Sequence, residues 1–253
     1  MTKLKTFFSD LFYELKLLQR SVPAVLLALF VVSVVSMNLL ANKSIDLHLD
    51  WLALDCGIIF SWLAFLVMDI LTKRYGVRAA NAISVMALLI NLIASLLFLA
   101  AAYIPGTWSQ SYVEGSEKVI NTALDMTFKS TWYVIMGSSV AFLCSAFLNN
   151  FLNHAIGKLF FKKSFLSFSV SSYASTFIAQ FVDNFLFAII VSHNFFGWTM
   201  VQCATCALTG AVAELILEVV FSPLGYKVVK KLDADGVGQE YIDYLTEKKE
   251  AKP

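Results

Sequence analysis

Six long apolar stretches constrain the fold of this chain more than any other feature of its sequence. They cover residues 22–41, 52–72, 79–103, 132–156, 165–192 and 196–224. A helix needs roughly 20 mostly apolar residues to cross the hydrocarbon core of a bilayer. With 58% hydrophobic residues and a mean hydropathy of +0.72, the chain also lies outside the usual composition of soluble domains. We therefore expect an all-α, polytopic membrane protein with six transmembrane helices, surrounded by the lipid bilayer.

The basic residues are distributed unevenly between the segments that connect these stretches. In a six-span topology, all 19 lysines and arginines except Lys43, Lys118 and Lys129 fall on the side of the two termini. Short loops rich in Lys and Arg stay in the cytoplasm. We therefore expect both termini to be cytoplasmic. Residues 1–20 would form an interfacial amphipathic segment, residues 21–226 the membrane domain and residues 227–253 a cytoplasmic tail.

The fifth stretch is apolar enough to lie in a bilayer, yet it carries Gln180, Asp183 and Asn184. A carboxylate in hydrocarbon costs several kcal/mol unless it faces a partner or a wet cavity. Polar side chains recur at helical spacing along one side of this stretch, namely Ser169, Ser172, Thr176, Gln180 and Asp183. We therefore expect this side to form one wall of a polar cavity.

Other polar side chains in the apolar stretches are candidates for the same cavity. Asn150 and Asn153 match Gln180 and Asp183 at a constant offset of 30 residues, as a weak internal repeat would. Asn38, near the outer end of the first stretch, would line a pocket mouth or hydrogen-bond between helices.

Three acids in the second and sixth stretches leave alternatives open. Asp69 would form an ion pair with Lys73 four residues on, or act as a gate or substrate contact. Glu218 would pair with Lys227 in a structural role or belong to the gate. Glu214, one turn from Glu218 and deeper, is harder to assign to structure and is a substrate-binding candidate.

Catalysis, metal binding and nucleic-acid binding find little support in the sequence. Cys203 and Cys206 form a C-x-x-C motif inside a span without a second ligand pair, which favours packing. The three histidines form no metal-ligand pattern, and the net charge of +1 is spread over several loops. We therefore expect no enzyme, no cofactor and no nucleic-acid partner.

Several short motifs, in the same order along the chain, resemble the queuosine precursor transporter family, also called the vitamin uptake transporter (VUT) family. They are Ser36-Met37-Asn38, the stretch from Asp69 to Gly76, Gln180-x-x-Asp183 with Phe185 to Phe187, and Ser222-Pro223-Leu224. The resemblance implies a six-span carrier of the bacterial inner membrane that imports 7-deazaguanine precursors of queuosine. The chain departs from the family at three positions. Many relatives have a lysine where this chain has Ala213, beside Glu214. A proline is frequent at the position of Trp62, and an aspartate at that of Asn153.

The chemistry of a deazaguanine assigns roles to these candidates. Asp183 or Glu214 would accept hydrogen bonds from the N1–H and exocyclic NH2 groups. Gln180 and Asn150 would bind the carbonyl side of the base, while Phe181, Phe185 or Trp62 would stack on its face.

The alternative function is a substrate-capture subunit that needs a separate ATPase and scaffold. Ala24 and Ala28 give the first span a small-xxx-small face that could dock on such a scaffold. The alternatives for the assembly of the chain are a homo-oligomer and an energy-coupling module.

Overall fold

The computed structural model describes residues 2–45, 48–49, 51, 54–108, 117–160, 164–194 and 197–250, and within these ranges the chain is almost entirely helical. Two short strands pair in antiparallel register, Ser44 with Asp55 and Ile45 with Leu54. In chain order the elements are α1 (Thr2–Ser21), α2 (Ala24–Leu40), β1 (Ser44–Ile45), β2 (Leu54–Asp55), α3 (Ile58–Tyr75), α4 (Val77–Tyr103), α5 (Glu117–Gly157), α6 (Phe165–Phe187), the π-helical η2 (Ala188–His193), α7 (Met200–Ala234) and α8 (Gln239–Glu250).

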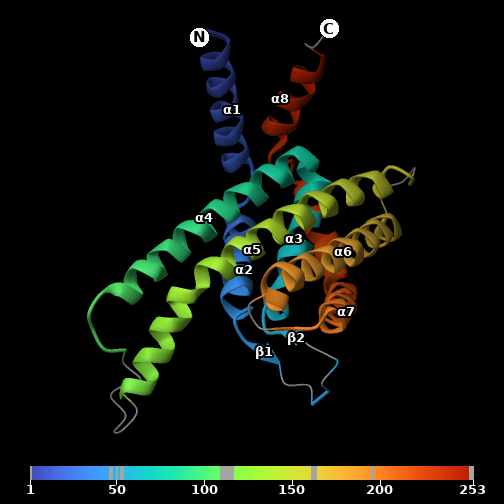
Figure 1. Ribbon diagram of the computed structural model, residues 1–253. Coiled ribbons are helices and arrows are strands. Elements are labelled where there is room, and N and C mark those ends of the chain that lie inside the picture. The colour runs from blue at the N-terminus through green and yellow to red at the C-terminus, as the bar shows by residue number, and fades with distance from the viewer. Residues whose placement is uncertain are drawn as a thin grey trace.

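Helices α2 to α7 pack into one bundle, and each coincides with one of the six apolar stretches. The terminal helices α1 and α8 project together from one end of this bundle (Figure 1). Glu14 on α1 holds them together through Lys248 on α8, with 2.8 Å between Oε2 and Nζ. Because the first and last helices share one end of the bundle, the chain crosses it an even number of times.

Four helical segments of the described chain are long and apolar enough to cross a membrane: Val77–Tyr103, Trp132–Gly157, Phe165–His193 and Met200–Ala234. A fifth is added if α2 and the preceding Ser9–Ser21, which meet at 104°, count as one span. Helix α2 alone has only 17 residues, and α3 carries Asp69, Lys73 and Arg74 within its 18 residues. The structure therefore has four to five candidate spans by length and composition, and the count of six remains a prediction.

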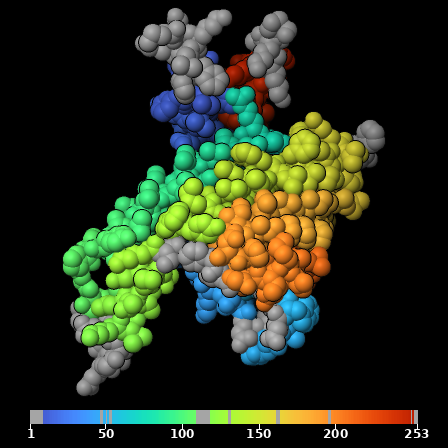
Figure 2. Space-filling model, viewed as in Figure 1, coloured from blue at the N-terminus to red at the C-terminus, as the bar shows by residue number. Residues whose placement is uncertain are grey.

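The surface of the bundle is apolar, and its interior combines a hydrophobic core with a set of buried polar side chains. Large hydrophobic side chains such as Leu96, Leu97 and Ile216 are more than half exposed, as expected for a surface that meets lipid. Ser172, Thr176 and Gln180, from the polar side of α6, are fully buried inside the bundle. Figure 2 shows α5 and α6 lying side by side across one face, where their outward residues form a continuous surface.

Helix α5 is longer than the sequence predicts. The fourth apolar stretch predicts a helix over residues 132–156, but Glu117–Gly157 is one continuous helix of 41 residues. Its first turns pack against the end of α4, where the rings of Phe98 and Phe128 lie 5.3 Å apart. Trp108 adds a stacked contact to Phe128 and donates to Asp125 at 2.9 Å. These contacts hold the segment against α4.

A single residue connects α3 to α4. Gly76 has φ of +87°, a backbone conformation that residues with a Cβ rarely adopt. The glycine therefore permits the sharp reversal between the two helices.

Candidate functional site

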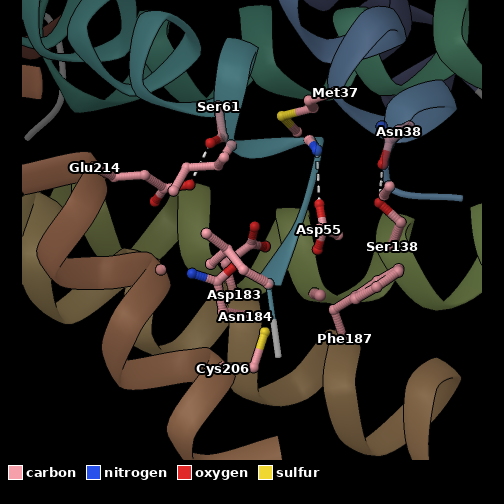
Figure 3. A pocket seen from close by; sticks show the side chains of 16 residues that line it. Met37, Asn38, Asp55, Ser61, Ser138, Asp183, Asn184, Phe187, Cys206 and Glu214 are labelled. Carbon is pink, nitrogen blue, oxygen red and sulfur yellow. Dashed lines mark hydrogen bonds between the residues drawn. The ribbon is translucent and has the colours of Figure 1, made fainter. Parts of the chain in front are cut away.

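A small pocket lies at the end of the bundle farthest from α1 and α8, and we call it the distal pocket (Figure 3). It is formed where α2 and α6 end and where α3 begins, with β2, α5 and the first half of α7 completing its wall. Its volume is about 40 Å³. Since one water needs roughly 10–15 Å³ of such space, the pocket as it stands holds a few waters. A larger ligand requires the surrounding helices to move apart.

Three carboxyl groups from three different elements point into this pocket: Asp55 from β2, Asp183 from α6 and Glu214 from α7 (Figure 3). Each accepts a hydrogen bond from a neutral donor. The Gly57 N–H lies 2.7 Å from Asp55 Oδ1, the Ser145 hydroxyl lies 2.9 Å from Asp183 Oδ1, and the Ser61 hydroxyl donates to Glu214 Oε1. Among the residues that the structure describes, no basic side chain lines the pocket. The site is therefore suited to a neutral or cationic ligand.

Two polar atoms beside the pocket have no hydrogen-bond partner among the described residues. They are the Nδ2 of Asn184, a donor, and the Oε2 of Glu214, an acceptor when the group is ionised. Gly210 on α7 lies directly against Asn184, and a Cβ at that position would be only 2.5 Å from Nδ2. An unpaired donor and an unpaired acceptor in one pocket can bind a ligand that presents both kinds of group on one edge.

Asn38 lies on the opposite wall of the pocket. Its Nδ2 donates to the Val34 carbonyl at 2.8 Å, and its Oδ1 accepts from the Ser138 hydroxyl. The side chain thus joins α2 to α5 while it lines the pocket, so it plays both roles that the sequence left open.

Six of the predicted substrate-binding residues do not line the distal pocket: Trp62, Asn150, Asn153, Gln180, Phe181 and Phe185. Asn150 accepts from Thr72 at 2.9 Å and donates to Asn81 at 2.7 Å, which ties α5 to α3 and α4. Gln180 and Asn153 are fully buried, and their amide groups lack partners among the described residues.

The aromatic residues expected to stack on a substrate stack on protein instead. Trp62 lies on Phe221 with 4.3 Å between ring centroids, and Phe181 lies on Phe185 at 5.7 Å. The aromatic ring that lines the pocket belongs to Phe187, at the end of α6.

Asp69 and Glu218 meet deeper in the bundle, where both side chains are fully buried. The Ser172 hydroxyl lies within hydrogen-bond distance of a carboxyl oxygen from each, and Asn149 Nδ2 donates to Asp69 at 2.8 Å. Since a hydroxyl has one proton to donate, Ser172 can serve only one of the two carboxylates at a time. We call this group, Asp69, Asn149, Ser172 and Glu218, the buried acid cluster.

The structure does not contain either ion pair considered for these acids. Lys73 donates to Ser171 Oγ at 2.5 Å and to the Asn153 carbonyl at 3.4 Å, and it forms no salt bridge with Asp69. Lys227 is exposed, whereas Glu218 faces the interior. Nine residues of a continuous α-helix make two and a half turns, so Glu218 and Lys227 lie on opposite sides of α7.

Among the polar and aromatic side chains that line the pocket, sequence reasoning missed Asp55, Ser61, Ser138 and Phe187. Asp55 was included in the second apolar stretch, but the helix begins only at Ile58 and Asp55 belongs to β2. The sequence signal that could have identified Asp55 was the presence of an acid near the boundary of an apolar stretch. Ser61 and Ser138 carried none, because serines at helix contacts look the same in a sequence.

Residues 55–228 match the model of a family described as "putative vitamin uptake transporter". The match covers more than half of the chain and includes every helix that forms the distal pocket except α2. No curated protein and no solved structure matches the chain.

Proposed function

The chain belongs to the vitamin uptake transporter family, and on this basis we propose that it imports a 7-deazaguanine precursor of queuosine through the distal pocket. The observation that carries the proposal is that Glu214 Oε2 and Asn184 Nδ2, at one pocket, both lack a hydrogen-bond partner among the described residues, none of which is a basic residue lining that pocket. A deazaguanine edge presents N–H donors next to a carbonyl acceptor, which is the complement of this pair.

The three carboxyl groups supply the acceptors for the donor side of the base. Asp183 or Glu214 would accept from N1–H and the exocyclic amine together, and bidentate bonds to a carboxylate are both strong and directional. Asn184 would donate to the carbonyl, and Phe187 would lie against the face of the ring. A substrate that also carries an aminomethyl cation would bind more tightly, because the carboxylate of Asp55 would attract its positive charge.

Movement through the protein requires the route beyond the distal pocket to open. From the distal pocket toward the end of the bundle that carries α1 and α8, the pocket residues of α3, α6 and α7 come first and the buried acid cluster comes next. Helix α6 runs in the opposite direction to α3 and α7, so its pocket residues lie near its C-terminal end. The cluster would therefore act as the closed barrier in alternating access around a central site. Six crossings with cytoplasmic termini would place the distal pocket on the outer side of the membrane.

Import can be tested in cells that cannot make queuosine precursors. We expect wild-type protein to restore queuosine in tRNA when a deazaguanine precursor is supplied outside. Asp183→Asn and Glu214→Gln should lower the rate of restoration by about tenfold or more, because each loses a charged acceptor to the bound base. Asp235→Asn, on the exposed end of α7, is the matched control and should behave as wild type. Full restoration by both pocket variants would remove these acids from the substrate site.

The capture-subunit alternative retains one structural observation in its favour. Ala24 and Ala28 are exposed on α2, next to the more exposed Val25 and Val32, so this face is open to lipid or to a scaffold helix. Copurification of the chain with an ATPase, together with no uptake by the isolated protein, would support this alternative.

A further inference from the structure

A second and larger cavity, of about 440 Å³, lies at the opposite end of the bundle, close to α1 and α8. We call it the proximal cavity. It is enclosed by the ends of α3 and α5, the start of α6 and the last turns of α7. Its residues are distinct from those of the distal pocket, and the buried acid cluster lies between the two. The proposed substrate site therefore leaves the proximal cavity without a role.

The charge of the proximal cavity is positive. Lys73, Lys158 and Lys230 line it, and among the described lining residues Asp233 is the one carboxylate. That carboxylate is already paired with Arg74, which lies outside the lining, at 2.9 Å. Lys158 and Lys230 form no salt bridge with any described residue. Three ammonium groups therefore face a space that contains little compensating charge.

The start of α6 adds further groups that favour an anion. Ser164 caps this helix of 23 residues, its hydroxyl accepting from the Ser167 N–H at 3.2 Å, and both serines line the cavity. The N-terminus of a helix carries the positive end of its dipole. The hydroxyls, the dipole and the lysines thus act on the same space.

One side of the cavity is apolar and continues onto the lipid-facing surface. Phe168 and Tyr226 form an edge-to-face pair at 5.9 Å in its wall. The ring of Phe165, which is 42% exposed at the start of α6, packs edge-to-face on the same Tyr226 at 5.5 Å. An amphipathic molecule could place an anionic head in the cavity and an apolar chain along this surface.

We propose that the proximal cavity binds a phosphate group, carried by an anionic phospholipid of the surrounding bilayer. Basic pockets between transmembrane helices on the cytoplasmic side are suited to such headgroups. The lysines supply charge, Ser164 and Ser167 supply hydroxyl donors, and the apolar wall receives the acyl chain. The proposal concerns a site other than that of the transported compound, so binding here and import there can succeed or fail separately.

The test uses the full chain in nanodiscs and compares thermal unfolding in phosphatidylcholine with unfolding in phosphatidylcholine that contains increasing phosphatidylglycerol. The variant Lys158→Gln/Lys230→Gln removes two cavity charges, and Lys227→Gln/Lys231→Gln removes two exposed charges from outside the cavity lining, on α7. The control accounts for attraction of any basic surface to an anionic bilayer. A third arm adds inorganic phosphate to protein in pure phosphatidylcholine.

We expect phosphatidylglycerol to stabilise wild type and the control alike. In the cavity variant the half-saturating lipid fraction should rise about fivefold for each lysine removed, as expected for a charge near an anionic headgroup. An equal stabilisation of wild type by inorganic phosphate, lost in the cavity variant, would support the phosphate site but assign it to a soluble ligand. If the cavity variant responds to both compounds as the control does, or if neither compound stabilises wild type, the proposal is wrong.

Discussion

The carboxyl group of Asp55 is buried, and burial is the main cause of its altered pKa. Removal from water raises the pKa of this carboxyl to about 6, and the hydrogen bond from the Gly57 N–H only partly opposes the shift. The folded protein therefore retains a proton that the unfolded chain, with a pKa near 3.8, has already released. Between these two values a rise in pH removes stability, because the folded state binds more protons than the unfolded state.

This behaviour gives a prediction for Asp55→Asn. Wild type should lose stability as pH rises from about 4 to about 7, and the variant should lose less over the same range, since its amide does not titrate. Thermal unfolding at a series of pH values measures the difference between the two slopes. Parallel curves for the two proteins would show that Asp55 is solvated as in the unfolded chain.

The sequence predicted individual site residues where a polar side chain stands in an apolar stretch, because burying such a group without a partner costs free energy. Asn38, Asp183, Asn184 and Glu214 stand in apolar stretches, and the structure brings all four to the distal pocket. The same reasoning also selected Asn150, whose amide is satisfied by Thr72 and Asn81. Sequence spacing gives the side of a helix on which a polar residue lies, but it does not give the partner that the residue meets there.

At the scale of elements, glycines mark where helices approach most closely. A Cβ at Gly137 on α5 would lie 2.4 Å from Val191 Cγ2 in the π-helical η2 segment. The added Cβ would be fixed to the backbone of α5, and Val191 has a branched, buried side chain, so neither atom can move away easily. Gly137→Ala should therefore destabilise the protein by about 1–3 kcal/mol, the usual cost of overpacking.

Thermal unfolding in detergent measures this loss directly. Gly106→Ala is the matched control, because a Cβ there would have no atom within 4 Å. A melting temperature for Gly137→Ala equal to that of the control would mean that α5 and η2 are farther apart than the structure places them.

One carboxylate, that of Glu14, joins α1 to two other helices. Glu14 is buried on α1, and it pairs with Arg78 on α4 at 2.5 Å as well as with Lys248 on α8 at 2.8 Å. The hydrogen bond to this carboxylate raises the pKa of Lys248, so the lysine remains charged at neutral pH. Glu14→Gln should weaken the docking of α8 by about 1–3 kcal/mol, as for hydrogen bonds between charged groups.

Hydrogen exchange locates that effect. Amides of Gln239–Glu250 should exchange faster in Glu14→Gln, while those of α5 and α6 remain as in wild type. Glu240→Gln, exposed on α8 itself, is the control and should leave exchange unchanged. Unaltered exchange in α8 of Glu14→Gln would show that other contacts hold the two helices together.

Element positions were predictable where hydrophobicity changes sharply along the chain. The six apolar stretches became α2 to α7, because burial in hydrocarbon leaves a helix as the one local solution for the backbone. The ends of the helices were less predictable. The first 14 residues of the 41-residue α5 are too polar for a span, and their helical state follows from contacts with α4 that the sequence does not show.

For the whole molecule, the arrangement of polar layers is more informative than any one residue. The distal pocket is acidic, the next layer is a closed acid cluster, and the proximal cavity is basic. An apolar exterior and a polar pocket separated from the other end of the bundle by buried polar groups are compatible with a carrier. The family match and the paired terminal helices agree with that organisation.

The most direct test of the central proposal is uptake of a labelled 7-deazaguanine precursor by liposomes that contain only the purified protein. We predict saturable uptake above that of empty liposomes, inhibited by excess unlabelled precursor and reduced about tenfold or more in Asp183→Asn but not in Asp235→Asn. Uptake by wild type no faster than into empty liposomes would contradict the proposal that this chain alone carries the precursor across the membrane.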